Sequence, residues 1–322
     1  MLGGSIFFQP SVICIYKITL RMTTVKISLA QFSPVYLNKD ESINKACQLI
    51  KDAAKEGAKL ILFPEAFIPG YPDWVWVLKN SQGAELNALY VELLNNAVSV
   101  PDDSTQKLCK AAKESGIYVG IGINERNSEG SDASLINSLL IINDKGEIET
   151  THRKLIPTGG ERTVWGQAAG ITDKVVESPF GKIGGLICWE AYMPTPRVRL
   201  YELGVQILLV PTWDKSDNWI QSMQHIAREG GVFVLSCCTA IRMDDIPDKY
   251  EFKKEYPGER EWINTGNSCV IDPKGRIIAG PLAEKQELIF ADLEMDLIKE
   301  AKRMFDVAGH YARPDVYQLK IS

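Results

Sequence analysis

The chain has few of the residues from which metal sites and disulfide frameworks are built. It contains 322 residues but only 3 histidines, His152, His225 and His310, which lie far apart in the sequence. Its 7 cysteines are an odd number, and no two of them form a Cys-x-x-Cys pair. This spacing predicts no metal site, and it favours reduced thiols in the cytoplasm over a disulfide framework.

The chain also lacks a basic run and a long apolar run. Its net charge of −5 is spread along the sequence, so we expect no nucleic-acid partner. The apolar stretch 6–20 is interrupted by Pro10 and Lys17, is too short to span a bilayer and has no basic segment before it. We therefore expect no membrane partner. Residues 1–22 are predicted to be a disordered extension, or to lie upstream of a true start at Met22, ahead of a single domain at 23–322.

A dinucleotide-binding turn is excluded as well. Gly120-Ile-Gly122 begins such a motif, but Glu125 stands where its third glycine belongs.

Strand-like and helix-like segments alternate from Val25 onward. Apolar periodicity predicts helices at 41–58, 104–115, 196–203 and 218–228, and Ser104 is the expected N-cap of the second. Buried strands are predicted at 25–31, 59–63, 117–123, 205–210 and 232–238, with hairpins at 137–154, 175–188 and, last in the chain, 270–278. Mixed hairpins and βα units predict one α/β domain, with two packed sheets layered with helices.

Three chemically active side chains follow predicted strands. Cys188 ends the apolar run that starts at Lys182, Glu65 follows the strand 59–63, and Lys154 ends a hairpin strand. A neutral cysteine needs activation, and an ammonium within about 4–6 Å lowers a thiol pKa, so we expect Lys154 to lower that of Cys188. Glu65 is the natural general base, taking the thiol proton and returning it to departing nitrogen. Taken singly, Glu65 and Lys154 are better explained as surface charges and Cys188 as a core residue, but the three together favour a catalytic site.

Further residues near these segments are candidates for the same site. Glu161, in a glycine-containing loop after Lys154, either holds Lys154, orients the hydrolytic water or is a solvated loop charge. Glu190 either supports the site, where substrate binding is one role, or caps the helix after Cys188. The aromatic residues Tyr71, Trp165 and Trp189 are predicted to wall an apolar substrate pocket, with core packing as the competing interpretation.

Five segments together resemble the nitrilase branch of the carbon–nitrogen hydrolase superfamily. They are FPEAFIPGYP (63–72), HRKLIPTGGERTVWGQ (152–167), CWEAYMP (188–194), HIAREGGVFVLS (225–236) and GHYARPDVYQL (309–319). The lysine segment that continues into ERTVWGQ, and CWE followed by YMP, are typical of nitrilases rather than amidases or carbamoylases. Ala191 departs from the pattern, because many nitrilases have asparagine there.

The resemblance implies a four-layer αββα sandwich with two mixed β-sheets, assembled as a homodimer or a larger homo-oligomer. It also implies no metal and no organic cofactor. By position, Cys188 is the nucleophile, Glu65 the general base, Lys154 the proton donor or stabiliser, and Glu161 the family's second glutamate. The implied reaction converts a small organic nitrile to its carboxylic acid and ammonia. Two competing hypotheses stay open: an amidase or nitrile-hydrating enzyme with the same three residues, and a catalytically silent assembly module.

Overall fold

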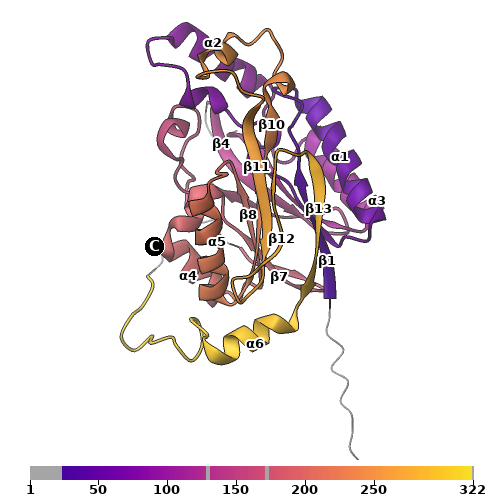
Figure 1. Cartoon of the computed structure of the whole chain (residues 1–322), viewed down its shortest axis with the longest axis vertical. Helices are drawn as coiled ribbons and strands as arrows, with labels where there is room; N and C mark the ends of the chain where they lie inside the picture. Colours follow the sequence, from indigo (N-terminus) through magenta and orange to yellow (C-terminus); the bar gives the residue numbers. More distant parts are fainter. Residues whose placement is uncertain (1–23, 128–130, 171–173, 321–322) are drawn as a thin grey trace, which may run out of the picture.

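Two mixed β-sheets pack face to face, and helices cover the outer face of each sheet (Figure 1). The computed structural model describes residues 24–127, 131–170 and 174–320, so the expected extension at 1–22 lies outside the described residues. The four-layer αββα arrangement that the resemblance implies is confirmed.

The first sheet carries the strands that precede Glu65 and Lys154. Its parallel pairs are β1 with β2 and β2 with β3, and its other pairs are antiparallel. From edge to edge it contains β13 (Glu287–Glu294), β1 (Thr24–Gln31), β2 (Leu60–Leu62), β3 (Tyr118–Asn127), β4 (Ser134–Ile142) and β5 (Ile148–Arg153).

The second sheet carries the strand that precedes Cys188. Its parallel pairs are β7 with β8 and β8 with β9. In order it contains β10 (Ala240–Arg242), β11 (Trp262–Ile271), β9 (Phe233–Cys238), β8 (Ile207–Thr212), β7 (Gly181–Gly185) and β6 (Val176–Ser178), and β12 (Ile277–Ala283) pairs with β11.

Among the described residues, four α-helices form the outer layers and two lie elsewhere. Helices α1 (Lys39–Lys55) and α3 (Asp103–Ser115) pack on the first sheet, and α4 (Pro194–Glu202) and α5 (Asp217–Gly230) on the second (Figure 1). Helices α2 (Gly83–Asn95) and α6 (Asp296–Met304) lie at opposite ends of the sandwich. Short 3₁₀ helices are η1 (Asp73–Trp76), η2 (Gly159–Thr163), η3 (Cys188–Tyr192), η4 (Met243–Asp245) and η5 (Glu251–Glu255). Within the described ranges, none of the helices has both the length and the apolarity needed to cross a bilayer.

Alternation along the strands produces the layers. In β2, Leu60 and Leu62 belong to the core between the sheets, whereas Ile61 belongs to the core under α1 and α3. Successive strand residues point to opposite faces, so three consecutive apolar residues fill two separate cores. The inter-sheet core also contains Leu139 from the first sheet and Leu209 from the second.

Two glycines allow the sheets to approach closely. A Cβ atom on Gly185 would lie 2.4 Å from Leu139 Cδ2, and one on Gly120 would lie 2.9 Å from Leu209 Cδ1. Gly120, part of the motif that resembled a dinucleotide turn, therefore has a packing role. Because Gly185 comes shortly before Cys188, this close approach also brings the thiol near the first sheet.

The sequence prediction missed several elements and misplaced one cap. Helices α2 and α6, strands β10 and β13 and the part of β11 before Val270 were not expected, and 270–278 is not the last strand pair because β13 follows and pairs with β1. Strand β13 has charged residues at both ends, and its partner is β1 at the other end of the described domain, so no local pattern indicated it. Asp102, not Ser104, caps α3 by accepting a 2.8 Å hydrogen bond from the Thr105 amide, while Gly116 ends the helix at φ +60° as predicted.

Candidate active site

Glu65 and Lys154 come together because their strands end at the same edge of the first sheet. Strands β2 and β3 are parallel, β4 runs opposite to β3, and β5 runs opposite to β4, so β5 has the direction of β2. Glu65 follows β2 after a short loop, and Lys154 follows β5 directly. The topology thus converts a separation of 89 residues into direct contact.

The loop that carries Glu65 lies against β3 at a glycine. A Cβ atom on Gly122 would lie 2.3 Å from the Pro64 carbonyl oxygen and 2.5 Å from the Ala66 amide nitrogen. Ala66 itself has φ +50°, a left-handed conformation that is uncommon outside glycine. This bend turns Glu65 inward, where the residue is only 1% exposed.

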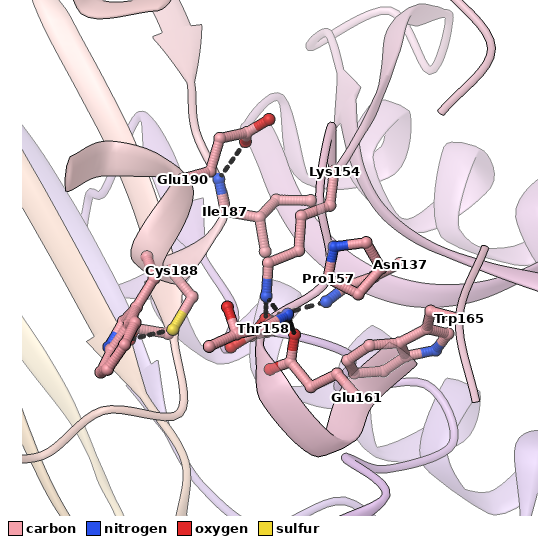
Figure 2. A network of polar contacts seen from close by, with 12 residues as sticks. Asn137, Lys154, Pro157, Thr158, Glu161, Trp165, Ile187, Cys188 and Glu190 are labelled. Carbon is pink, nitrogen blue, oxygen red and sulfur yellow. Dashed lines mark hydrogen bonds and ion pairs between the residues drawn. The ribbon is translucent and has the colours of Figure 1, made fainter. Parts of the chain in front are cut away.

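Lys154 lies between two carboxylates (Figure 2). Its Nζ atom donates to Glu65 Oε1 and to Glu161 Oε2, each at 2.8 Å, and its side chain is fully buried. The Trp165 ring lies 5.8 Å from the same nitrogen. A buried ammonium with two carboxylate partners is held in one position, with its charge more than balanced.

Glu161 is a buried anchor rather than a solvated loop charge. Its Oε1 atom accepts from Tyr71 Oη at 2.6 Å, and its Oε2 atom accepts from the Thr158 amide at 2.6 Å as well as from Lys154. Trp76 Nε1 in turn donates to Tyr71 Oη at 3.2 Å. These bonds support the first role that the sequence left open for Glu161, holding Lys154.

Cys188 enters the site on a sharp backbone turn. Strand β7 ends at Gly185, earlier than predicted, and Cys188 begins η3 with φ +51°. The residue is 4% exposed, and its Sγ atom accepts a hydrogen bond from Thr212 Oγ1 at 3.1 Å. The expected strand thus ends three residues before Cys188, and the thiol lies at the start of a short helix instead.

The charges of the site determine the protonation of the thiol. Burial, together with the charge of Glu65, raises the pKa of Cys188 well above its ordinary value. Lys154 lowers this pKa, as expected, but its effect is outweighed. The expectation that Lys154 brings this pKa below its ordinary value is therefore wrong, because burial of the thiol raises the pKa and the lysine's charge is shared with two carboxylates. The thiol is neutral until a base removes its proton.

The two partners of the thiol also have shifted pKa values. Burial raises the pKa of Glu65, and Glu161 adds to this effect, while Lys154 and Asn137 oppose it. Burial alone would lower the pKa of Lys154, but the neighbouring carboxylates, Glu65 foremost, raise it above its ordinary value. The site thus combines a carboxylate with increased basicity and a permanently charged ammonium.

Glu190 connects the turn at Cys188 with the end of β5. Its carboxylate accepts from the Ile187 amide at 2.8 Å (Figure 2). It also accepts from the Leu155 amide at 2.9 Å and contacts His152 Nε2 at 2.7 Å. Burial on its own would raise the pKa of Glu190, but His152 and the two amides lower it. Both oxygens of Glu190 are hydrogen-bonded to protein groups, which fits a supporting role. The contact of Glu190 with substrate stays a prediction.

The predicted aromatic residues divide into two groups. Tyr71 and Trp165 are buried at the site, with ring centroids 5.5 Å apart, and Trp213 stacks on Tyr71 at 4.3 Å. Trp189 is 48% exposed, and its Nε1 atom donates to Asp214 Oδ2 at 2.8 Å. Tyr71 and Trp165 thus lie beside the charged residues of the site. Trp189 is adjacent to Cys188 in sequence, but its side chain lies at the surface.

Two polar residues of the site were not identified from the sequence. Asn137 Nδ2 donates to Glu65 Oε1 at 2.8 Å, and Thr212 contacts the thiol. Each is a polar residue within or after an apolar strand run, which is the one signal that the sequence offered. Among the residues that the structure describes, no three His, Cys, Asp or Glu side chains are grouped so that they could hold a metal ion.

Comparison of the sequence with known proteins identifies the family. The profile of the carbon-nitrogen hydrolase family matches residues 26–303. An aliphatic nitrilase of Sinorhizobium fredii is 37% identical over 93% of this chain and 96% of its own length. Nitrilase 1 of Arabidopsis thaliana is 38% identical over 93% of this chain and 87% of its own length. A bifunctional nitrilase/nitrile hydratase of Nicotiana tabacum is 37% identical over 92% of this chain and 85% of its own length.

Solved structures share the fold. Nit3 of Saccharomyces cerevisiae, a member of branch 10 of the nitrilase superfamily, has a TM-score of 0.70 at 20% identity, covering 90% of this chain and 97% of its own. An amidase from Nesterenkonia has a TM-score of 0.64 at 18% identity, covering 89% of this chain and 98% of its own. The family profile and the curated relatives both span nearly all of the described domain. The chain therefore belongs to the carbon–nitrogen hydrolase family and is an enzyme of its nitrilase branch.

Proposed function

We propose that this enzyme hydrolyses a small organic nitrile to its carboxylic acid and ammonia, with Cys188 as nucleophile. The observation that carries the proposal is the placement of one ammonium between two carboxylates, in electrostatic contact with a buried neutral thiol. The curated relatives named as nitrilases support the choice of substrate class.

The first step forms a carbon–sulfur bond. Glu65 takes the proton of Cys188 as the sulfur attacks the nitrile carbon, and an electron pair of the triple bond moves to nitrogen. The proton then passes to that nitrogen, which gives a neutral thioimidate. Glu65 suits this role because burial raises its pKa, bringing it closer to that of the groups with which it exchanges protons. Lys154 stabilises the negative charge that develops on nitrogen.

Two waters complete the reaction. Glu65 removes a proton from the first water as its oxygen adds to the thioimidate carbon, and the proton is delivered to nitrogen. The carbon–nitrogen bond breaks as the proton of the new hydroxyl group passes to nitrogen, so ammonia leaves and a thioester remains. A second water adds in the same way, the carbon–sulfur bond breaks, and the acid and the thiol of Cys188 are released. In this scheme Glu161 keeps Lys154 in place, and Tyr71 and Trp165 contact the substrate.

A second outcome branches from the same intermediate. If the carbon–sulfur bond breaks after the first water, the product is the amide and only one water is consumed. The Nicotiana tabacum relative is named as a bifunctional nitrilase/nitrile hydratase, so this branch is tested together with the first. An enzyme that acts on amides alone and a catalytically silent assembly module are the two hypotheses that compete with nitrile hydrolysis.

The test is ammonia release from aromatic, arylacetic and aliphatic nitriles and their amides, with acid and amide resolved by chromatography. We expect acid and ammonia in equal amounts from at least one nitrile, and no product with Cys188→Ala. Cys109→Ala, which removes a half-buried thiol on α3, is the matched control and should keep full activity. Turnover of amides only, or product from Cys188→Ala, would contradict the proposal. A homodimer or larger assembly in the cytoplasm is also proposed, and light scattering tests the assembly.

A further inference from the structure

Thr212 and Cys188 occupy equivalent places beyond two neighbouring parallel strands. Strands β7 and β8 pair in register, with Gly185 opposite Leu209. Cys188 lies as far beyond Gly185 as Thr212 lies beyond Leu209, so the two side chains emerge side by side at the same edge of the second sheet. The sulfur and the hydroxyl oxygen are 3.1 Å apart, although 24 residues separate them in sequence.

The Thr212 hydroxyl has a fixed direction. Its oxygen accepts a 2.9 Å hydrogen bond from the Asp214 amide, and its single hydrogen is donated to Cys188 Sγ. The residue is fully buried, and a β-branched side chain has few accessible rotamers. The hydroxyl is therefore a preset donor that needs no rearrangement when the sulfur becomes charged.

A negatively charged sulfur needs such a donor, because two of its neighbours are carboxylates and the one nearby cation is bound to both of them. Glu65 and Glu161 disfavour a thiolate, and Lys154 is bound to both of these carboxylates. A negative charge on this thiol would raise the pKa of Tyr71, Tyr192 and Cys238, and none of these three groups carries a positive charge. A hydrogen bond to the charged form of a group favours that form.

The same bond directs the thiol proton. Because the sulfur accepts from Thr212, the S–H bond points elsewhere. Glu65 Oε2 is buried and has no hydrogen-bond partner within the described residues, while Glu65 Oε1 is taken by Lys154 and Asn137. This oxygen is thus free to accept a proton that leaves the sulfur.

We propose that Thr212 is a catalytic residue of this enzyme, whose hydroxyl stabilises the negative sulfur of Cys188 as it attacks and as it is later expelled. The inference rests on the proposed function, because it concerns the same sulfur. Thr212 makes the carbon–sulfur bond easier to form and to break without itself gaining or losing a proton.

The test compares Thr212→Val, which keeps the shape but removes the hydroxyl, with Thr212→Ser, which keeps the hydroxyl. Ser236→Ala is the matched control. Ser236 is a buried hydroxyl opposite Val210 on β9, and it accepts a hydrogen bond from Trp219 Nε1, so its removal also leaves one buried donor without its acceptor. Thr212→Ala is a second variant without the hydroxyl, and thermal unfolding verifies that each variant is folded.

The first readout is the rate of alkylation of Cys188 by iodoacetamide at pH 8, followed at this cysteine by mass spectrometry. Below the midpoint of the thiol, this rate is proportional to the thiolate fraction. A hydrogen bond to a charged group corresponds to about a 10-fold change or more. We expect both variants without the hydroxyl to react at least about 10-fold more slowly than wild type, with Thr212→Ser and Ser236→Ala within about 3-fold.

The second readout separates this inference from the proposed function. With a nitrile that is turned over, Thr212→Val should lower kcat at least about 10-fold and leave KM nearly unchanged. If the folded variants without the hydroxyl are alkylated at the wild-type rate, the role of Thr212 is refuted, whatever the substrate. If alkylation slows but wild type acts on no nitrile, the inference stands and the proposed function fails.

Discussion

Replacing Glu190 by glutamine should weaken the hydrogen bonds that connect the turn at Cys188 with the segment after β5 that contains Lys154. The two oxygens of Glu190 serve three donors: the Ile187 amide, the Leu155 amide and His152 Nε2. Ile187 precedes Cys188 and Leu155 follows Lys154, so this one carboxylate joins both sides of the site. Glutamine has nearly the same shape but only one acceptor oxygen, and it carries no charge.

The magnitude follows from counting the donors that lose a partner. Whichever way the amide of glutamine points, its NH₂ group faces the Ile187 or the Leu155 amide, so at least one buried N–H is left without an acceptor. Such a group costs about 1–3 kcal/mol, and the remaining bonds lose the contribution of the negative charge. We expect Glu190→Gln to lower the free energy of unfolding by about 2–4 kcal/mol. A shift of the Cys188 turn by about 1 Å would lower kcat about 100-fold.

The assay is urea denaturation combined with kcat on the nitrile identified by the substrate panel. Glu125→Gln is the control, because Glu125 is an equally buried carboxylate whose bonds to Ser138 and Arg153 lie within the first sheet. We expect Glu125→Gln to lose a similar stability but to keep kcat within about 3-fold. Equal losses of kcat in both variants would show only general destabilisation. A Glu190→Gln enzyme within about 0.5 kcal/mol of wild type would refute the reasoning altogether.

Three further predictions concern packing and pH. Gly122→Ala places a methyl group against the Pro64 carbonyl, so it should cost about 1–3 kcal/mol and reduce activity, whereas Gly83→Ala, with open space around it, should be neutral in the same urea assay. Leu209→Ala, in the core between the sheets, should lower the free energy of unfolding by about 2–5 kcal/mol; a loss under about 1 kcal/mol would contradict the close packing. Burial raises the pKa of Asp73 to about 6, so its contribution to stability is present below about pH 4 and is lost as pH rises through 6. The stability of wild type relative to Asp73→Asn should therefore fall by about 3 kcal/mol between about pH 4 and 7; a difference that stays constant over this range would show that Asp73 has no raised pKa.

The sequence alone was sufficient for the layers and for the main charged residues. Apolar alternation in short strands and the periodicity of the helices identify which faces are buried, and these patterns are local. Glu65, Lys154 and Cys188 were found because each follows a buried strand, where a reactive side chain is unusual. Strand β13 was missed because its pairing with β1 joins the two ends of the described domain, and no local pattern reveals a partner so distant.

Only the tertiary structure determined how these residues act. Thr212 and Asn137 contact Cys188 and Glu65 across 24 and 72 residues, through strand pairing and not through any local motif. The pKa of Cys188 has the opposite shift to the one expected, because the sequence shows that a lysine is available but neither that the thiol is buried nor that two carboxylates share the lysine. Electrostatic effects depend on burial and on distances of a few ångströms. The residue types were therefore readable from the chain, whereas the protonation of the thiol and the donors around it depend on the folded arrangement.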